Sequence, residues 1–164
     1  VGTNQFYKDI DHNEIFEFKE VHWVNQPENI AKNDNLISIN NTLMIDLTGQ
    51  AASESIGVKQ YSGTGGQVNF NQGAKMSKGG KRILSLASTY TDKDGNLKSK
   101  ILPTLPEGSI VTTSRNEQEY IVTEYGVANI YLDSISTRVK KLIQIAHPDF
   151  RDELTFYAKK YKWI

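Results

Sequence analysis

The sequence predicts an α/β fold in which an open mixed sheet is flanked by helices. Short strand-like runs bounded by turn residues recur between residues 36 and 123. The run Tyr120–Thr123 (YIVT) is continuous and β-branched, which is typical of a strand buried on both faces. From Ser134 onward the apolar residues recur at helical spacing. Short strands followed by helices favour a mixed sheet over an all-parallel one.

The composition limits the class of protein. A chain of 164 residues is long enough for one domain with a substantial core. Its 19 basic and 19 acidic side chains give no net charge, which argues against binding nucleic acid or a membrane surface. The sequence has no cysteine, and no apolar run approaches the ~18 residues of a membrane span. We therefore expect a cytoplasmic protein with no nucleic-acid or membrane partner.

The start of the sequence suggests one domain of a longer protein. There is no initiator Met, and Val1–Gly2 has the character of the end of a strand that begins elsewhere. No internal repeat or linker divides residues 1–164, so we expect a single domain.

The first thirty residues carry signals for three elements. Thr3 is placed to cap a short helix over Asn4–Ile10. Ile15–Val24 alternates apolar and polar residues, and a period of two over this length predicts a half-buried strand. Pro27 stands in the first turn of a second short helix, where its missing N–H costs nothing.

Two adjacent amides, Asn40 and Asn41, separate strand-like runs that begin at Leu36 and end at Leu47. Buried amides need hydrogen-bond partners. Asn is also a common turn residue. The pair is therefore either a turn between strands or a carboxamide aimed into a cleft, and the pattern alone leaves both open.

The stretch Gly63–Lys81 is rich in glycine. It holds Gly63, Gly65, Gly66, Gly73, Gly79 and Gly80. Glycine suits positive φ or a close approach to the backbone, so GTGG and KGGK are interpreted as tight turns separated by Gln67–Ala74. Free N–H groups in such turns form anion-binding nests, and Lys78 and Lys81 add positive charge beside the second turn. Two ordinary surface turns would give the same pattern, and the spacing fits no phosphate loop.

After the glycines the sequence predicts more strands. Arg82–Ser88 is an apolar run, and Thr91–Asn96 is a hairpin turn with Asp94–Gly95 at its tip, after which Lys98–Leu102 returns as a strand. Ile110–Thr112 begins another strand. We expect the strands at Arg82–Ser88, Ile110–Thr112 and Tyr120–Thr123 to share one sheet.

The C-terminal third is predicted to form two helices. Ser134 is an N-cap candidate for a helix that ends near Ala146 and packs on the sheet. His147–Pro148 ends that helix and starts another, whose acidic first turn and basic last turn match the helix dipole. Phe150, Leu154 and Tyr157 are its expected core residues.

Few side chains suggest chemistry by themselves. The histidines His12, His22 and His147 lack the close spacing of metal ligands, so no metal site is expected. Glu54 and Glu124 lie in turn-like sequence, and capping or pairing suits them better than nucleophilic attack.

Seven ordered motifs give the chain a family resemblance. They are SIN (38–40), SESIG (53–57), SGTGGQVNF (62–70), SKGGK (77–81), VTTSRN (111–116), VTEYGVAN (122–129) and IAHPDFR (145–151). Together they resemble the C-terminal domain of the acetyl-CoA hydrolase/transferase family, which includes 4-hydroxybutyrate and acetate CoA-transferases. The resemblance implies the CoA-transferase fold and a parent enzyme more than twice this length.

The resemblance also implies a reaction. Such enzymes move coenzyme A from an acyl-CoA to a free carboxylate through a glutamyl-CoA thioester. The attacking glutamate would precede Val1, so the chain alone is expected to be inactive. Coenzyme A would be a substrate, with no permanently bound cofactor. The implied partners are acyl-CoA, a small carboxylate, an N-terminal domain and a second copy in a homodimer.

The resemblance assigns site residues as well. Asn40 would orient the reacting groups, and Gly79 or Gly80 would donate a backbone N–H to the oxyanion. Gly63, Gly65, Gly66 and Gln67 would line the substrate cleft, with Lys78 and Lys81 beside it. Asn40, GTGG and KGGK are therefore expected to converge, because preorganised N–H donors are what a thioester oxyanion needs.

The sequence departs from the family pattern at two positions, and it leaves two alternative functions open. Asn41 stands where a small residue is more usual, and Arg82 where Ser is common, and either could change the cleft. A thioester hydrolase on the same scaffold, or a non-catalytic assembly domain, would carry the same motifs.

Overall fold

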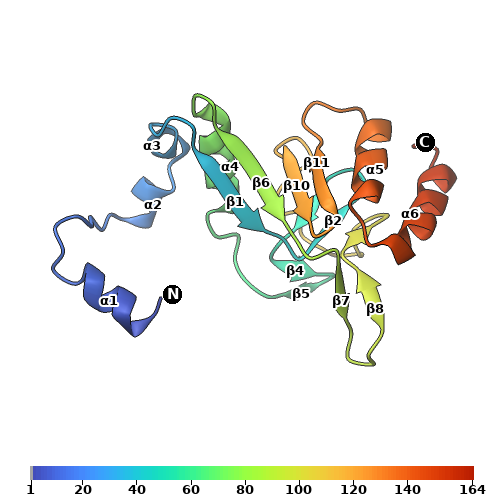
Figure 1. Ribbon diagram of the computed structural model, residues 1–164, viewed down its shortest axis with the longest axis horizontal. Coiled ribbons are helices and arrows are strands. Elements are labelled where there is room, and N and C mark those ends of the chain that lie inside the picture. The colour runs from blue at the N-terminus through green and yellow to red at the C-terminus, as the bar shows by residue number, and fades with distance from the viewer. Residues whose placement is uncertain (1) are drawn as a thin grey trace.

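A four-stranded sheet forms the centre of the protein, whose computed structural model describes residues 2–164 (Figure 1). Its strands are β1 (Ile37–Asn41), β6 (Lys81–Ser85), β10 (Tyr120–Thr123) and β11 (Gly126–Asn129), in the order β1-β6-β10-β11. The first three are mutually parallel, and β11 returns antiparallel to β10. The predicted open mixed sheet is therefore confirmed.

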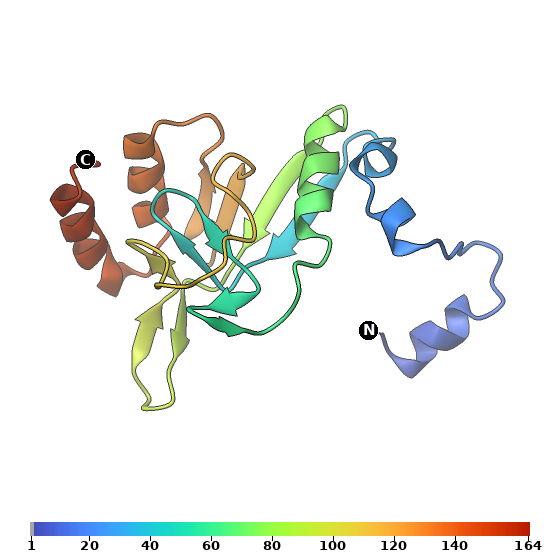
Figure 2. The same cartoon turned by 180° about the vertical axis from the view of Figure 1, so that it is seen from behind.

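The pairing register separates the two faces of this sheet. Ser38 lies opposite Arg82, and Asn40 lies opposite Leu84, so these four side chains share a face. Helix α4 (Gln67–Met76) covers the β1 end of that face and is seen in front of the sheet in Figure 2. It connects β1 to the parallel strand β6, as the crossover of a βαβ unit does.

Smaller sheets lie beside the central one. They are β2 (Met44–Asp46), β3 (Ala51–Ala52) and β9 (Ile101–Leu102) in one sheet, the hairpin β4 (Ser55–Ile56) and β5 (Lys59–Gln60), and the hairpin β7 (Thr89–Thr91) and β8 (Leu97–Ser99). The β7–β8 hairpin confirms the turn predicted at Asp94–Gly95, where Gly95 has a φ of 84°. Asp92 accepts hydrogen bonds from the N–H groups of Asp94 and Asn96 and so fixes this turn.

The core lies between the central sheet, the β2 sheet and the C-terminal helices α5 (Ile135–Gln144) and α6 (Pro148–Lys160). Ile45 of β2, Leu84 of β6, Ile121 of β10, and Val139 and Leu142 of α5 are buried there. Both predicted helices and the break at His147–Pro148 are confirmed. Leu154 and Ala158 face the core from α6, whereas Phe150 and Tyr157 are only half-buried.

Two predictions about strands of the central sheet need correction. Tyr120–Thr123 is an interior strand, but only one of its faces is covered, since Ile121 is fully buried and Val122 is half-buried. Ile110–Thr112 forms no strand. Only the next residue, Thr113, makes a single antiparallel bridge, to Ala51. The N–H groups of Thr112 and Thr113 both donate to the carbonyl oxygen of Ala51, and the Thr112 hydroxyl accepts from the N–H of Ser53, so the segment contacts β3 instead of entering the central sheet.

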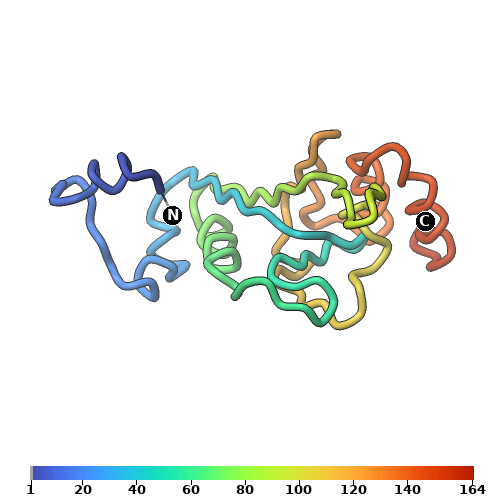
Figure 3. Tube along the Cα trace, turned by 90° about the horizontal axis from the view of Figure 1, so that it is seen from below, coloured from blue at the N-terminus to red at the C-terminus, as the bar shows by residue number. Residues whose placement is uncertain are grey.

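The N-terminal residues form an arm that extends away from the sheet (Figure 3). It contains α1 (Asn4–Ile10), α2 (Val21–Val24) and α3 (Pro27–Ile30). The predicted caps of the first and third helices are confirmed, because the Thr3 hydroxyl accepts from the N–H of Phe6 and Pro27 opens α3. The half-buried strand predicted at Ile15–Val24 is wrong. Its apolar side chains are exposed, and period-two alternation forms a strand only where a sheet edge is available to pair with it.

The cap of α5 leads to a stability prediction. The Ser134 hydroxyl accepts a hydrogen bond of 3.2 Å from the N–H of Thr137. Ser134→Ala should lower the free energy of unfolding by about 1 kcal/mol, measured by urea denaturation, because α5 packs on the core. The matched control is Thr3→Ala, which removes the same kind of cap from α1. That helix buries no residue, so global stability should not change. Equal losses from the two variants would contradict this explanation.

Among residues 2–164, no helix has both the length and the apolar content needed to cross a membrane.

Candidate functional site

The GTGG turn lies at the amino end of α4. Gly65 has a φ of 57°, a left-handed conformation that favours glycine, and Gly66 is the N-cap of the helix. The first N–H groups of a helix have no partner within it, and the helix dipole places positive potential at the same end. A side chain at Gly63 or Gly65 would meet no described atom within 4 Å. The turn therefore has open space beside Gly63 and Gly65 at the amino end of the helix.

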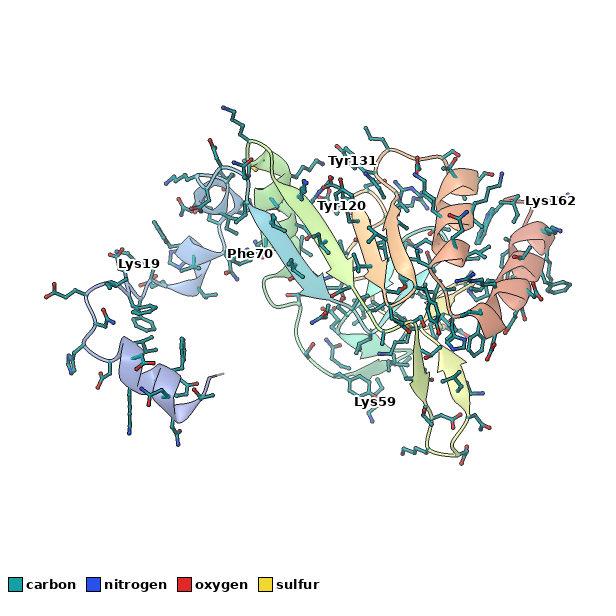
Figure 4. The ribbon with its side chains drawn as sticks, viewed as in Figure 1. Lys19, Lys59, Phe70, Tyr120, Tyr131 and Lys162 are labelled. Atoms are coloured by element: carbon teal, nitrogen blue, oxygen red, sulfur yellow. The ribbon has the colours of Figure 1, made fainter. Side chains whose placement is uncertain are left out.

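The side-chain amide of Asn25, which belongs to none of the family motifs, lies against this turn. A Cβ built on Gly66 would be 3.1 Å from Nδ2 of Asn25 and 3.3 Å from the ring of Phe70. Asn25 is the C-cap residue of α2 and is half-buried. Phe70 lies on the side of α4 that faces α2 (Figure 4). Glycine at position 66 is what allows the Asn25 amide to come this close to the helix terminus.

Helix α3 holds Asn25 in place. A Cβ on Gly73 would lie 2.4 Å from Cγ2 of Ile30, so glycine in the middle of α4 lets α3 pack directly on it. Ile30 is the one buried residue of α3. No sequence signal links Asn25 to Gly66, because an Asn at a helix boundary is also an ordinary turn residue. The pairing depends on the packing of two helices.

The other side of the turn is tied to the core. Gln67, the first residue of α4, is buried and donates a hydrogen bond of 2.8 Å to the hydroxyl of Thr113. Upstream, the carbonyl oxygen of Glu54 accepts from the N–H groups of Tyr61 and Ser62 at 2.7 and 3.3 Å. These contacts hold both ends of the glycine turn.

Asn40 lies at the carboxyl end of β1, beneath α4. Its Nδ2 donates to the hydroxyl of Ser38 at 3.0 Å and to Oδ1 of Asn71 at 3.4 Å. Asn71 is a buried residue of α4. Asn40 therefore belongs to the same layer as the GTGG turn, but its amide joins the helix to the strand. Asn40 is thus a strand residue and not the turn that the pattern allowed.

The predicted convergence of three elements is wrong for the KGGK turn. Gly79 and Gly80 follow the carboxyl end of α4 and lead into β6 at Lys81, which lies opposite Ile37 at the start of β1. The GTGG turn is at the other end of this ten-residue helix, on the order of 15 Å away.

The KGGK turn has a structural reason for its glycines. A Cβ on Gly80 would lie 2.0 Å from the carbonyl oxygen of Ala74, and Gly79 has a φ of 75°. The side chains of Lys78 and Lys81 are exposed beside this turn.

The two residues that depart from the family pattern, Arg82 and Asn41, make their contacts away from the GTGG turn. Arg82 is buried, with Nε 3.1 Å from Oε2 of Glu119, and its guanidinium carbon lies 4.6 Å from the ring centroid of Tyr131. Asn41 occupies the face of the sheet opposite to Asn40, where its Oδ1 accepts a hydrogen bond of 2.5 Å from Ser85. Arg82 thus takes part in a structural ion pair.

The two carboxylates differ. Glu124 accepts hydrogen bonds from the N–H and hydroxyl of Ser88, as predicted for a pairing residue. Desolvation by burial acts to raise the pKa of the Glu124 carboxyl. The hydrogen bonds from Ser88 act in the other direction and prevail, so this pKa lies below its ordinary value. Glu54 is 3% exposed, and its Oε2 has no hydrogen-bond partner in the part of the chain described. The prediction that Glu54 pairs through its side chain is therefore wrong.

The histidines are spread over the molecule. His12 and His22 are exposed on the arm, and His147 caps α6 by accepting from the N–H of Asp149. No group of three metal-ligating side chains occurs within residues 2–164.

A separate apolar cavity of about 560 Å³ lies between β2, β9, the β7–β8 hairpin and α6. Met44, Tyr90 and Phe150 are among its lining residues. None of the residues predicted for the site lines it.

Comparisons with known proteins agree with the motifs. The family model of the acetyl-CoA hydrolase/transferase C-terminal domain matches residues 2–158. The chain is 49% identical, over its whole length, to a succinyl-CoA:cyclohexane-1-carboxylate CoA transferase of Geobacter metallireducens. It is also 49% identical, over 98% of its length, to a 4-hydroxybutyrate coenzyme A transferase of Clostridium kluyveri. The chain spans only 37% of each of these relatives.

Solved structures give the same result. RipA from Yersinia pestis matches 100% of this chain with a TM-score of 0.89 and 43% identity, and the match covers 36% of that protein. A 4-hydroxybutyrate CoA-transferase from Porphyromonas gingivalis matches 98% of the chain with a TM-score of 0.77 and 38% identity, over 35% of its length. The predicted fold and family are confirmed. The chain belongs to the acetyl-CoA hydrolase/transferase family and corresponds to its C-terminal domain.

Proposed function

We propose that the chain is the C-terminal domain of an acyl-CoA:carboxylate CoA-transferase. The observation that supports this most directly is the GTGG turn at the amino end of α4, with the Asn25 amide against Gly66. Backbone N–H groups, a helix terminus and a side-chain amide are together the donors that stabilise a developing oxyanion.

The reaction needs a nucleophile from outside these 164 residues. The carboxylate nucleophile of the enzyme attacks the thioester carbonyl of the acyl-CoA. The carbon–sulfur bond then breaks, CoA departs as a thiolate, and an anhydride between the acyl group and the nucleophile remains. The thiolate then attacks the nucleophile's own carbonyl, forms an enzyme–CoA thioester and releases the first acid. At each addition the carbonyl oxygen becomes an oxyanion, and the GTGG turn and the Asn25 amide would stabilise it.

Some of the predicted site residues would face the thioester, and others would only support the turn or lie away from it. Gly63, Gly65, Gly66 and Gln67 form the turn that faces the thioester, and Asn40 supports α4 through Asn71. Gly79 and Gly80 would shape the entry to β6. Lys78 and Lys81 lie too far from the turn to touch the thioester. Their exposed charges suit the phosphates of CoA, which would be a substrate with no resident cofactor required.

Isotope exchange tests the transfer reaction. The full-length protein, incubated with unlabelled acetyl-CoA and labelled acetate, should incorporate label into acetyl-CoA. The 164-residue chain alone should not, because it lacks the nucleophile. Release of free CoA without incorporation would favour the hydrolase alternative. Absence of any turnover across several acyl-CoAs would favour an assembly domain. Turnover by the isolated chain that is lost on mutating Glu54 or Glu124 would place the nucleophile within it.

A further inference from the structure

One face of the four-stranded sheet is not covered by any described helix or second sheet. We call it the open face; it carries Ile37, Ile39, Ile83, Tyr120, Val122 and Val127. The register requires these side chains to share a face, because Ile39 lies opposite Ile83, Ile83 opposite Tyr120, and Val122 opposite Val127. Figure 1 shows this face toward the viewer, with α4 behind it.

The open face is strongly apolar for a surface. Ile37, Ile39 and Val127 are 55%, 66% and 62% exposed. On the opposite face, the partners in the same strands (Ser38, Leu84, Ile121 and Ala128) are almost fully buried. Three of the four strands are parallel, and parallel sheets in α/β proteins are covered on both faces. A contiguous apolar patch of this kind marks an interaction surface.

We propose that an apolar helical layer from outside these 164 residues covers the open face in the full-length protein. The chain spans only 36–37% of the relatives that it matches, so such proteins hold the additional elements. In RipA the same fold, matched along the whole chain, is part of a chain nearly three times as long. Longer proteins that contain this fold therefore have further elements available to cover such a face.

The chemistry of the face defines its partner. It has one charged side chain, Lys81, at the amino end of β6. Asn41 and Ser85 hydrogen-bond to each other at the carboxyl end of β1 and β6, and a further polar side chain, Asn129, lies opposite Tyr120 at the end of β11. Its centre therefore carries no charge, and its polar groups are the Tyr120 hydroxyl and the side chains at the strand ends. A helix with an apolar stripe would bury this apolar centre, as helices bury sheet faces in α/β domains. This inference does not depend on the proposed reaction.

The absence of cysteine allows a direct test by thiol labelling. Ile39→Cys and Val127→Cys would be made in a full-length protein whose own cysteines have been replaced. The matched control is Leu132→Cys, an 81% exposed apolar residue in the loop after β11. The rate of reaction with a disulfide reagent is measured for each variant, natively and in denaturant, at several protein concentrations. Circular dichroism and CoA-transfer activity are recorded separately.

The two open-face thiols should react at least about 100-fold more slowly in the native than in the denatured protein, at every concentration. The control thiol should react within a few-fold of its denatured rate. Native rates at positions 39 and 127 that equal the control would overturn the proposal. Protection that appears only as concentration rises would also overturn it, because a second copy would then be the cover. Labelling rates do not depend on turnover, so a failed activity assay leaves this result interpretable.

Discussion

Replacing Asn25 by alanine in the full-length protein is expected to lower kcat for CoA transfer about 100-fold, with KM for the acyl-CoA changed only a few-fold. The reason is the position of its amide beside Gly66 at the amino end of α4. A donor aimed at a developing oxyanion stabilises the transition state more than the bound substrate. Steady-state kinetics with acetyl-CoA and varied carboxylates measure both constants.

Asn40→Ala provides the matched control. It removes the same functional group from the same layer, but the Asn40 amide is engaged by Ser38 and Asn71. It should therefore lower the free energy of unfolding by about 1 kcal/mol and reduce kcat less than Asn25→Ala does. A large loss of kcat from Asn40→Ala, with none from Asn25→Ala, would restore Asn40 as the orienting residue and contradict the geometric assignment.

The second large effect concerns stability. Glu119→Ala should lower the free energy of unfolding by about 3 kcal/mol, because it leaves the buried Arg82 guanidinium without its carboxylate. Both the N–H and Nε of Arg82 lie 3.1 Å from Oε2 of Glu119. The side chain of Arg82 is 3% exposed and that of Glu119 is 16% exposed, so water cannot readily replace the lost partner. Urea unfolding followed by far-UV circular dichroism measures the change.

An exposed ion pair serves as the comparison for Glu119→Ala. Lys98 lies 3.8 Å from Asp92 at the β7–β8 hairpin, and its side chain is 51% exposed. Lys98→Ala should change stability by less than about 1 kcal/mol, because solvent screens the pair. If Glu119→Ala costs no more than Lys98→Ala, the remaining contacts of Arg82, to the Glu117 carbonyl and the Tyr131 ring, are sufficient to stabilise it.

The local signals in the sequence were reliable. The caps at Thr3 and Ser134, the break at His147–Pro148 and the turn at Asp94–Gly95 all appear where the residues predicted them. Each of these features depends on hydrogen bonds between residues a few positions apart, so the local sequence carries nearly all the information needed. The glycine turn also belongs to this group, since its positive φ at Gly65 is a property of the backbone itself.

Signals that depend on a distant partner were less reliable. Ile15–Val24 has the alternation of a strand, but alternation only makes a segment suitable for pairing and does not supply the partner. The same limit applies to Ile110–Thr112, which contacts β3 through the N–H and the hydroxyl of Thr112 without joining the central sheet. The family motifs identified the fold and family, but they did not predict how far apart the two glycine turns lie.

The sequence by itself therefore determined the fold class, the family and the presence of a glycine turn at residues 63–66. Only the tertiary structure decided which amide accompanies that turn. Asn25 and Gly66 are brought together because Gly73 lets α3 pack on α4, and α4 in turn separates Gly79 and Gly80 from the site by its own length. Adjacent residues such as Asn40 and Asn41 point to opposite faces of β1. Which of those faces is covered depends on packing across the sheet, and no local pattern encodes it.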